Sequence, residues 1–439
     1  MDLLNFFKWL NADILALPTT LLFFGAGLVL TIKTGFLQLR AFPKFISLVT
    51  KGFARKKKSG EAGEMKTINP FHALFTAMGT VIGMGNVVSP SIAIMMGGPG
   101  ALFWLVAYIF LGAATKFTEV TFALHTRIKT AEGHIIGGPM VYLKAVSPFL
   151  AYWYGIITIF LYAAWSGFQA NTLAQIFALE GVSEIITGLL LAVIVLIVVS
   201  GGATRVGYFA SKLVPFMFIL YVSFAASILF KDIYLLKGAI ILVGKSIFSV
   251  PAAMGGFLGA TAFQAMRHGI YRGIYITESG LGTSSIPHSM ADTQKPTDQG
   301  ILAMFSAAAD IFLCLLSGLL VLVTGIWLHG DLRSTLIYEV FKTYTGSLGQ
   351  FVLIVSVGLF VLTTVIGNSF NGLQSFASLT KHRWLMLYLV FSLLNIILGS
   401  LVKIGLVLEA TDTLLALVAI PNIIGILILA FRKPEVLKV

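Results

Sequence analysis

The sequence has a single cysteine among its 439 residues, and only 11% of the residues are charged. One thiol, Cys314, cannot form an internal disulfide or build a thiolate metal site, so disulfide-stabilised and zinc–thiolate proteins are excluded. An ordinary soluble domain has about 25% charged residues. The low charge therefore excludes a soluble enzyme with a conventional core.

Histidine is also scarce and scattered. None of the seven histidines lies four positions from another, so a metal site of the HExxH type, which places two His on one helix face, is absent. No nucleophile and base stand out as a pair inside the apolar runs. We therefore expect a protein that is not an enzyme and that uses no cofactor.

Apolar residues, in contrast, are abundant: they make up 57% of the chain, and the mean hydropathy is +0.93. About 20 consecutive apolar residues span a bilayer as a helix. We predict an all-α polytopic membrane protein, in contact with lipid, with 11 transmembrane helices. The apolar runs are 14–32, 70–96, 100–124, 149–178, 185–200, 206–230, 235–263, 301–328, 346–370, 384–402 and 413–431.

Basic residues outnumber acidic ones, and the net charge is +12. In a membrane protein such an excess collects in cytoplasmic loops, so we predict no nucleic-acid partner. The loop after the first run carries nine basic residues between Lys33 and Lys66 and is assigned to the cytoplasm. Eleven spans then place 22 basic residues inside and six outside. This predicts a multi-pass integral membrane protein, of the bacterial inner (plasma) membrane, with a cytoplasmic C-terminus.

Two of the runs are poor uninterrupted helices. Glycines and a proline weaken the second run between Gly79 and Pro90, and they weaken the seventh between Pro251 and Gly259. These runs begin two successive sets of five helices, and an odd number of spans inverts the second set. Residues 1–67 then form an extra helix with a basic loop, 68–230 the first repeat, and 231–439 the second. Paired broken helices in inverted repeats predict a substrate site at the midplane.

Several motifs resemble the signature of the alanine/glycine:cation symporter family. They are Gly83-Met-Gly-Asn86, Gly97-Gly-Pro-Gly-Ala-Leu-Phe-Trp104, Ala113-Ala-Thr-Lys-Phe-Thr-Glu-Val120, Gly137-Gly-Pro-Met140, Gln169-Ala-Asn171, Gly255-Gly-Phe257 and Glu278-Ser-Gly-Leu-Gly-Thr-Ser284. The resemblance implies the leucine-transporter fold with one extra N-terminal helix. It also implies a secondary transporter that imports alanine, glycine or a related small amino acid with sodium by alternating access.

The resemblance also implies a sodium site. The stretch from Gly79 to Asn86 is similar to the unwound first core helix of the neurotransmitter:sodium symporters, so the carbonyls of Gly79 and Ile82 would face sodium. Thr363 and Thr364 match the family's paired hydroxyl residues. Carbonyl and hydroxyl oxygens suit a hard cation, and the carboxyl end of a half-helix carries partial negative charge. Without the resemblance, both threonines could instead bond to their own helix.

The expected substrate site lies beside the sodium site. A broken helix frees N–H groups that suit an amino-acid carboxylate, and Gly85 and Asn86 stand at that point. Gln169 aligns with a polar family position, although a lone Gln between spans is also common as a link between helices. The opposite wall would come from the second broken helix, at Gly255, Gly256 and Phe257.

The sequence leaves the family pattern at two places. The family usually has Gly-Trp shortly after its paired hydroxyl residues, but Asn368 stands here in place of the Trp. Val88-Ser89-Pro90 also departs from the usual run after the broken-helix Asn. Both changes line the expected pocket, so a neutral substrate larger or more polar than alanine stays open.

Ionisable residues within the runs are functional candidates. Lys116 and Glu119 stand three apart on one helix and are predicted to form an ion pair. Asp310 is nearly alone in its run; it could relay protons, or it could be a packing carboxylate. Proton coupling and a transport-deficient amino-acid sensor are therefore the alternatives to sodium symport, and the oligomeric state stays open.

Overall fold

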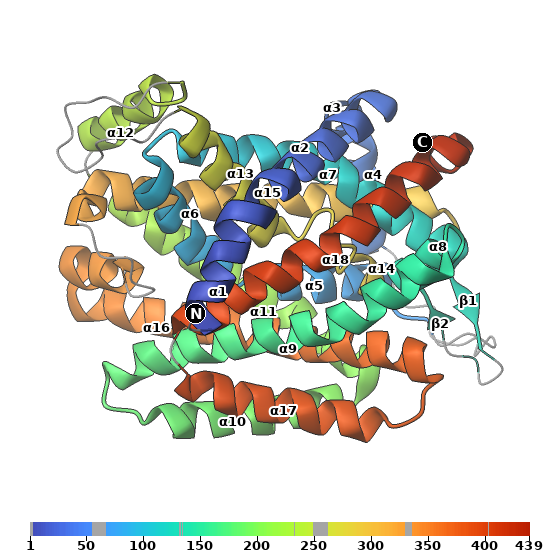
Figure 1. Ribbon diagram of the computed structural model, residues 1–439. Helices are drawn as coiled ribbons and strands as arrows, with labels where there is room; N and C mark the ends of the chain where they lie inside the picture. The colour runs from blue at the N-terminus through green and yellow to red at the C-terminus, as the bar shows by residue number, and fades with distance from the viewer. Residues whose placement is uncertain are drawn as a thin grey trace.

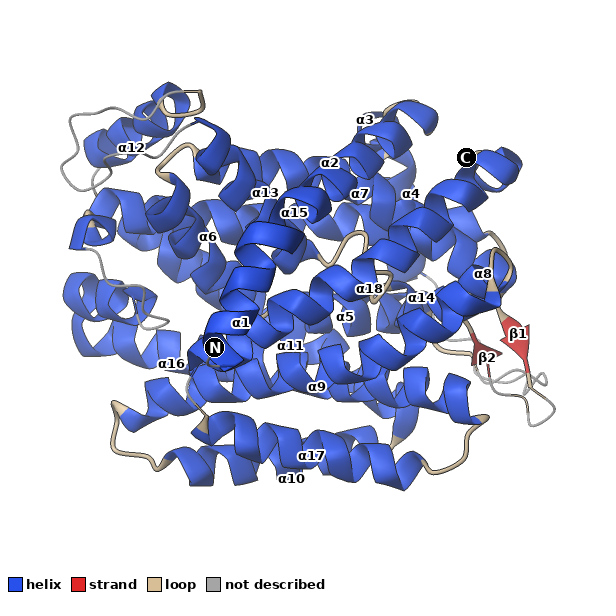
Figure 2. Ribbon diagram, in the orientation of Figure 1, coloured by secondary structure: helices blue, strands red, loops and turns tan. Residues whose placement is uncertain are grey.

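The computed structural model describes residues 3–54, 67–130, 133, 135–231, 233–248, 262–329, 336–402 and 404–439. Helices make up most of these ranges, and the strands are confined to one short hairpin at the right of the view (Figures 1 and 2). In the hairpin, Ile128 pairs with Ile136 and Lys129 with Ile135, antiparallel. The all-α class predicted from the sequence is confirmed.

The elements follow one another as a series of long helices with short connections. They are α1 (Leu3–Trp9), η1 (Leu10–Leu15), α2 (Ala16–Lys33), α3 (Leu37–Arg40), α4 (Phe42–Ala54), α5 (Pro70–Val81), α6 (Met84–Gly97), α7 (Ala101–Thr126), β1 (Ile128–Lys129), β2 (Ile135–Ile136), α8 (Pro139–Lys144), α9 (Pro148–Ala178), α10 (Glu184–Val199), α11 (Gly202–Leu229), α12 (Ile233–Lys245), α13 (Ala262–Thr277), α14 (Ser285–Ser289), α15 (Pro296–Thr324), η2 (Ile326–His329), α16 (Leu336–Thr380), α17 (Leu385–Leu401), α18 (Ile404–Arg432) and η3 (Pro434–Leu437).

Local chemistry sets several helix ends. Asn69 caps α5: its side-chain oxygen accepts a hydrogen bond from the Phe71 N–H at 2.8 Å, and Pro70 occupies the first helical position. Proline suits that position because its missing N–H would have no intrahelical partner. α9 and α15 begin with proline in the same way, at Pro148 and Pro296.

Seven helices of the described ranges are long and apolar enough to cross a membrane, and the bent pair α5–α6 adds an eighth span. α10 and α17 are apolar but shorter. The eight spans and the two shorter helices coincide with ten of the eleven predicted runs. The chain is therefore a multi-pass membrane protein, while the count of eleven and the inverted repeat stay predictions.

The seventh run, 235–263, was predicted to be an interrupted helix. Its first part is α12, which ends at Lys245; residues 249–261 lie outside the described residues, which resume with α13 at Ala262. The predicted wall residues Gly255, Gly256 and Phe257 lie outside the described residues. Hydropathy missed α13 because it carries Arg267, His268 and Arg272.

The long helices form two packed groups. α7 packs against α13 and α15, while α9 packs against α16 and α17. Figure 1 shows α9, α10 and α17 running side by side along the bottom of the molecule. α18 lies on α9, and α5 contacts α11 and α16. α6 contacts α13 and α15 of the first group, so the bend between α5 and α6 lies where the two groups meet.

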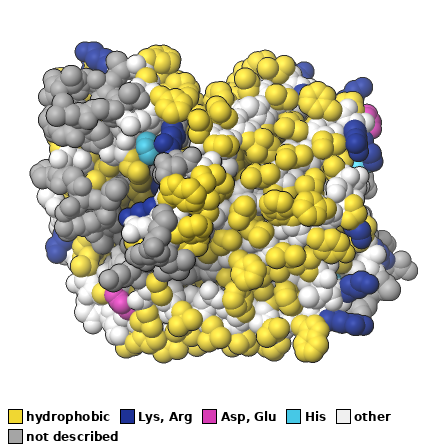
Figure 3. All heavy atoms as spheres, in the orientation of Figure 1, with side chains coloured by type: hydrophobic (Ala, Val, Ile, Leu, Met, Phe, Trp, Pro, Cys, Tyr) yellow, Lys and Arg dark blue, Asp and Glu magenta, His cyan; other side chains and the backbone are white. Residues whose placement is uncertain are grey.

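The outer surface is apolar. Large side chains such as Leu190, Val193 and Ile197 of α10 are exposed, and hydrophobic side chains cover most of the face in Figure 3. Lys and Arg side chains gather along the right-hand edge of that view, near the hairpin and the C-terminus. An apolar surface of this extent is stable in contact with lipid tails.

Candidate functional site

The first break in the fold lies between α5 and α6. Ile82 is extended (φ −78°, ψ 95°), Gly83 is extended too (φ −142°, ψ −161°), and the two helices meet at 41°. The break leaves the last carbonyls of α5 and the first N–H groups of α6 without intrahelical partners. Both sets lie in the interior, because Gly79, Ile82 and Gly83 are buried.

Thr364 of α16 contacts the carbonyl groups at the end of α5. Its hydroxyl donates to the Gly79 carbonyl at 3.1 Å and to the Ile82 carbonyl at 3.2 Å. Three of the four oxygen ligands predicted for sodium, the Gly79 and Ile82 carbonyls and the Thr364 hydroxyl, therefore lie next to one another. The Thr363 hydroxyl instead donates to the Leu359 and Phe360 carbonyls of its own helix, at 2.9 and 3.1 Å.

The amide side of the break is held by two carboxamides. The Gln169 side-chain oxygen accepts from the Met84 N–H at 3.3 Å. The Asn86 side-chain oxygen accepts from the Gly83 N–H at 3.2 Å, and its Nδ2 donates to Asp310 Oδ1 at 2.9 Å. Both ends of the Asn86 side chain are thus engaged in stabilising the break.

Tyr275 of α13 is a site residue that the sequence did not single out. A Cβ at Gly85 would lie 3.4 Å from the Tyr275 ring, so this ring faces the first turn of α6. Trp165 and Phe168 pack edge-on to the same ring. The Tyr275 hydroxyl is buried and has no hydrogen-bond partner among the described residues. The only indication in the sequence that Tyr275 could belong to the site was its position three residues before the Glu278–Ser284 motif.

A second break follows α13, at residues 278–284. Glu278, Gly280 and Gly282 have φ of +54°, +97° and +75°, which no helix allows. The chain resumes as the short helix α14. The break that the sequence predicted in the seventh run, at residues 251–259, lies outside the described residues.

Asn368 lies on α16 one turn beyond Thr364. Its side chain is fully buried, and neither atom of its carboxamide has a hydrogen-bond partner in the part of the chain that is described. A buried polar atom without a hydrogen bond lowers the stability of the folded protein, unless a ligand or a water molecule bonds to it. Asn368 therefore offers a free donor and a free acceptor one turn from Thr364, which contacts the first break.

Lys116, Glu119 and Asp310 are the ionisable residues that the sequence singled out as functional candidates. Asp310 is buried and bonds to Asn86, so it belongs to the first break. Glu119 accepts hydrogen bonds from the Gly282 N–H and the Asn422 side chain, at 2.9 and 2.7 Å. The expected Lys116–Glu119 pair is not among the ion pairs within 4.0 Å that the described residues form.

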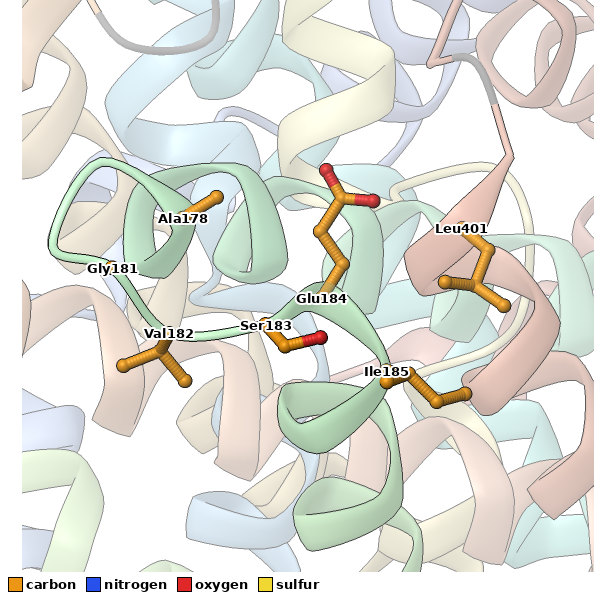
Figure 4. Close-up of a pocket in the computed structure, with 7 residues that line it drawn as sticks. All are labelled: Ala178, Gly181, Val182, Ser183, Glu184, Ile185 and Leu401. Carbon is orange, nitrogen blue, oxygen red and sulfur yellow. The ribbon is translucent and has the colours of Figure 1, made fainter.

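Two surface hollows lie away from the breaks. The first is at the α9–α10 turn, where Ser183, Glu184 and Leu401 contribute to its wall (Figure 4). The second lies at the start of α5, between His72 and Thr204 of α11. Neither is lined by a residue of the first break. Among the described residues, no group of three or more His, Cys, Asp and Glu could hold a metal ion.

Comparison with solved structures gives the class of the protein. The fold matches a crystal structure of MhsT in complex with L-phenylalanine, with a TM-score of 0.63 at 14% identity, covering 84% of this chain and 90% of that one. The protein thus has the leucine-transporter type of fold.

The chain belongs to the sodium:alanine symporter family, whose model matches residues 2–438. It is 30% identical to the sodium/alanine symporter AgcS of Methanococcus maripaludis over 98% of this chain and 95% of that protein. It is 28% identical to the probable sodium/glutamine symporter GlnT of Bacillus subtilis over 92% of this chain and 84% of that protein. The family resemblance read from the motifs is confirmed.

Proposed function

We propose that the protein imports a small neutral amino acid together with sodium by alternating access, with its C-terminus in the cytoplasm of a bacterial inner membrane. The observation that carries the proposal is the Thr364 hydroxyl, which lies within 3.2 Å of both the Gly79 and the Ile82 carbonyl oxygens. Family membership and the named relatives support sodium-coupled amino-acid transport.

Sodium between these oxygens would link the two groups of helices. Gly79 and Ile82 belong to the broken helix α5, while Thr364 belongs to α16, which packs on α9. A cation that shares ligands from both sides favours the arrangement in which the two approach each other. Binding free energy can then shift the conformational equilibrium, because the ion interacts differently with the two states.

The amino acid would lie beside the ion, at the start of α6. The Gly85 N–H belongs to the first turn, whose amides attract a carboxylate. The Tyr275 ring faces this turn, Gln169 contacts its first amide, and Asn368 presents an unpaired carboxamide. We assign Asn86 to holding the break, because both ends of its side chain are already bonded.

Sodium replacement tests the coupling. One sodium ion entering down about 100 mV and a tenfold gradient would sustain roughly 500-fold accumulation of a zwitterion. Uptake of labelled alanine into vesicles should therefore fall to background when choline replaces sodium. Uptake that is unchanged when choline replaces sodium, but that stops when a protonophore is added, would favour the second candidate function, proton coupling through Asp310. The Asp310 side chain accepts a hydrogen bond from Asn86 at the first break.

Asn368 is expected to widen the range of substrates. A Trp at this position would bury about 150–250 Å² and close a small pocket, whereas Asn is smaller and offers both a donor and an acceptor. We therefore propose that neutral amino acids such as serine, threonine or glutamine also enter. One relative is named for alanine and another for glutamine.

The substitution Asn368→Trp should restore a narrow selectivity. Steric exclusion penalises only the larger ligands. Unlabelled glutamine and threonine should therefore no longer inhibit the uptake of labelled alanine by the variant, while unlabelled glycine should still inhibit it. The measurement is a competition series on the parent protein and the variant. If the parent already rejects every amino acid larger than alanine, Asn368 does not set the selectivity.

A further inference from the structure

Asn422 of α18 makes three hydrogen bonds in the interior. Its Nδ2 donates to Glu119 Oε1 and to the Gly280 carbonyl, each at 2.7 Å. Its Oδ1 accepts from the Tyr142 hydroxyl at 2.6 Å. The side chain is fully buried. One carboxamide thereby joins α7, α8 and α18 to the second break.

The second break is enclosed from several sides at this point. Glu119 accepts from the Gly282 N–H at 2.9 Å, and the Tyr108 hydroxyl donates to the Ser279 carbonyl at 2.8 Å. A Cβ at Gly282 would lie 2.4 Å from Pro139 Cγ, so α8 approaches the backbone directly. Only glycine allows this approach at a φ of +75°. Any movement of the break must first separate it from these side chains.

α18 has a proline directly before Asn422. Pro421 lies inside the helix, and a proline at such a position removes one hydrogen bond of the helix and weakens it locally. The carbonyl four residues earlier, at Leu417, accepts instead from the Trp153 indole N–H of α9 at 3.0 Å. α18 is thus attached to α9 before the proline and to the second break after it.

The joined elements come from both groups of helices. Glu119 is on α7, which packs on α13 and α15, whereas α18 and α8 pack on α9. α8 and α14 lie together at the right of Figure 1, at the opposite end from α12. Alternating access requires that the two groups separate at one end at a time, so bonds between them at that end must break and re-form.

We propose that Asn422, with Glu119 and Tyr142, is a latch that closes the end of the protein carrying α8 and α14 and that opens by movement of α18 beyond Pro421. In the orientation proposed above this is the cytoplasmic end, where substrate and sodium leave. Glu119 and Asn422 are positioning residues: they act through the second break and do not contact the substrate. The inference rests on the proposed transport cycle.

Thiol labelling at Ser284 tests the latch without a substrate. Ser284 stands at the end of the second break and is buried, and the native Cys314 is buried too. The purified protein, in detergent, should therefore give a low background with maleimide. In Ser284→Cys the new thiol should react slowly, because position 284 is buried while the second break is held in place. Failure of sodium-driven uptake would leave this measurement unaffected, so the two proposals can fail separately.

Removing the latch should speed the labelling. An ordinary hydrogen bond shifts an equilibrium by about 2- to 12-fold, so adding Asn422→Ala to Ser284→Cys should raise the rate at least about tenfold. Tyr142→Phe removes one of the bonds and should raise it about 2- to 12-fold. The matched control is Asn171→Ala, which removes another buried Asn that donates to the Gly399 and Val402 carbonyls; it should leave the rate unchanged.

Two results would overturn the proposal. The first is an unchanged labelling rate in Asn422→Ala. The second is an equal acceleration by Asn171→Ala, which would show general loosening of the fold instead of a latch. If Asn422→Ala does not fold, Tyr142→Phe decides the question, because loss of one hydroxyl is a smaller change; an unchanged rate in that variant contradicts the latch.

Discussion

Gly83→Ala is expected to abolish sodium-driven uptake, by a factor on the order of 100 or more. A Cβ at this position would lie 2.6 Å from Thr364 Oγ1 and 3.0 Å from Gln169 Nε2. Gly83 is extended, so alanine is not excluded by its backbone conformation. The effect is steric: Thr364 can make room only by turning its hydroxyl away from the two carbonyls that it now contacts.

Gly358→Ala is the matched control for this substitution. Gly358 lies on α16, the helix that carries Thr364, and a Cβ there meets nothing within 4 Å. The control should keep its uptake, because it adds a methyl group to α16 in open space. Initial rates of labelled alanine uptake, normalised to the amount of folded protein, compare the two. Equal rates in both variants would show that the packing at the break does not matter for transport.

Thr364→Ala should weaken apparent sodium affinity about 5- to 150-fold, because the loss of one oxygen ligand costs about 1–3 kcal/mol. Thr363→Ala should change it far less, since the Thr363 hydroxyl bonds to its own helix. Thr364→Ser keeps the hydroxyl and should behave like the parent. A sodium titration of uptake at saturating alanine measures all three.

The opposite ranking of the two threonines would contradict the assignment. If Thr363→Ala shifts sodium half-saturation more than Thr364→Ala, the ion lies on the other face of α16. If Thr364→Ala leaves half-saturation unmoved and lowers alanine affinity, the hydroxyl contacts the amino acid. Thr364→Ser separates loss of the hydroxyl from loss of packing.

The first break could be predicted because its signal is local. Gly79, Gly83, Gly85 and Pro90 lie within twelve consecutive residues, and such a run cannot form a regular helix. The residues that contact the break could be predicted only from the family resemblance, since Thr364 is separated from Gly79 by 285 residues. Periodicity and hydropathy carry no information about which distant helices meet.

The helix α13 was missed because it looks too polar for a membrane helix. Its Arg272 lies 3.8 Å from Asp412 of α18, and both side chains are buried. A charge that is paired with another inside the protein does not need to leave the membrane. Hydropathy treats each residue alone, so it placed the seventh helix on 235–263 and left Tyr275 outside the predicted site.

The most direct test of sodium symport is the flux of sodium itself. Purified protein in proteoliposomes should take up labelled sodium faster when alanine is present, and Thr364→Ala should lose this stimulation at low sodium concentrations. The proposed coupling requires the two fluxes to rise together. Alanine uptake that proceeds while the sodium flux stays at its basal value would contradict it.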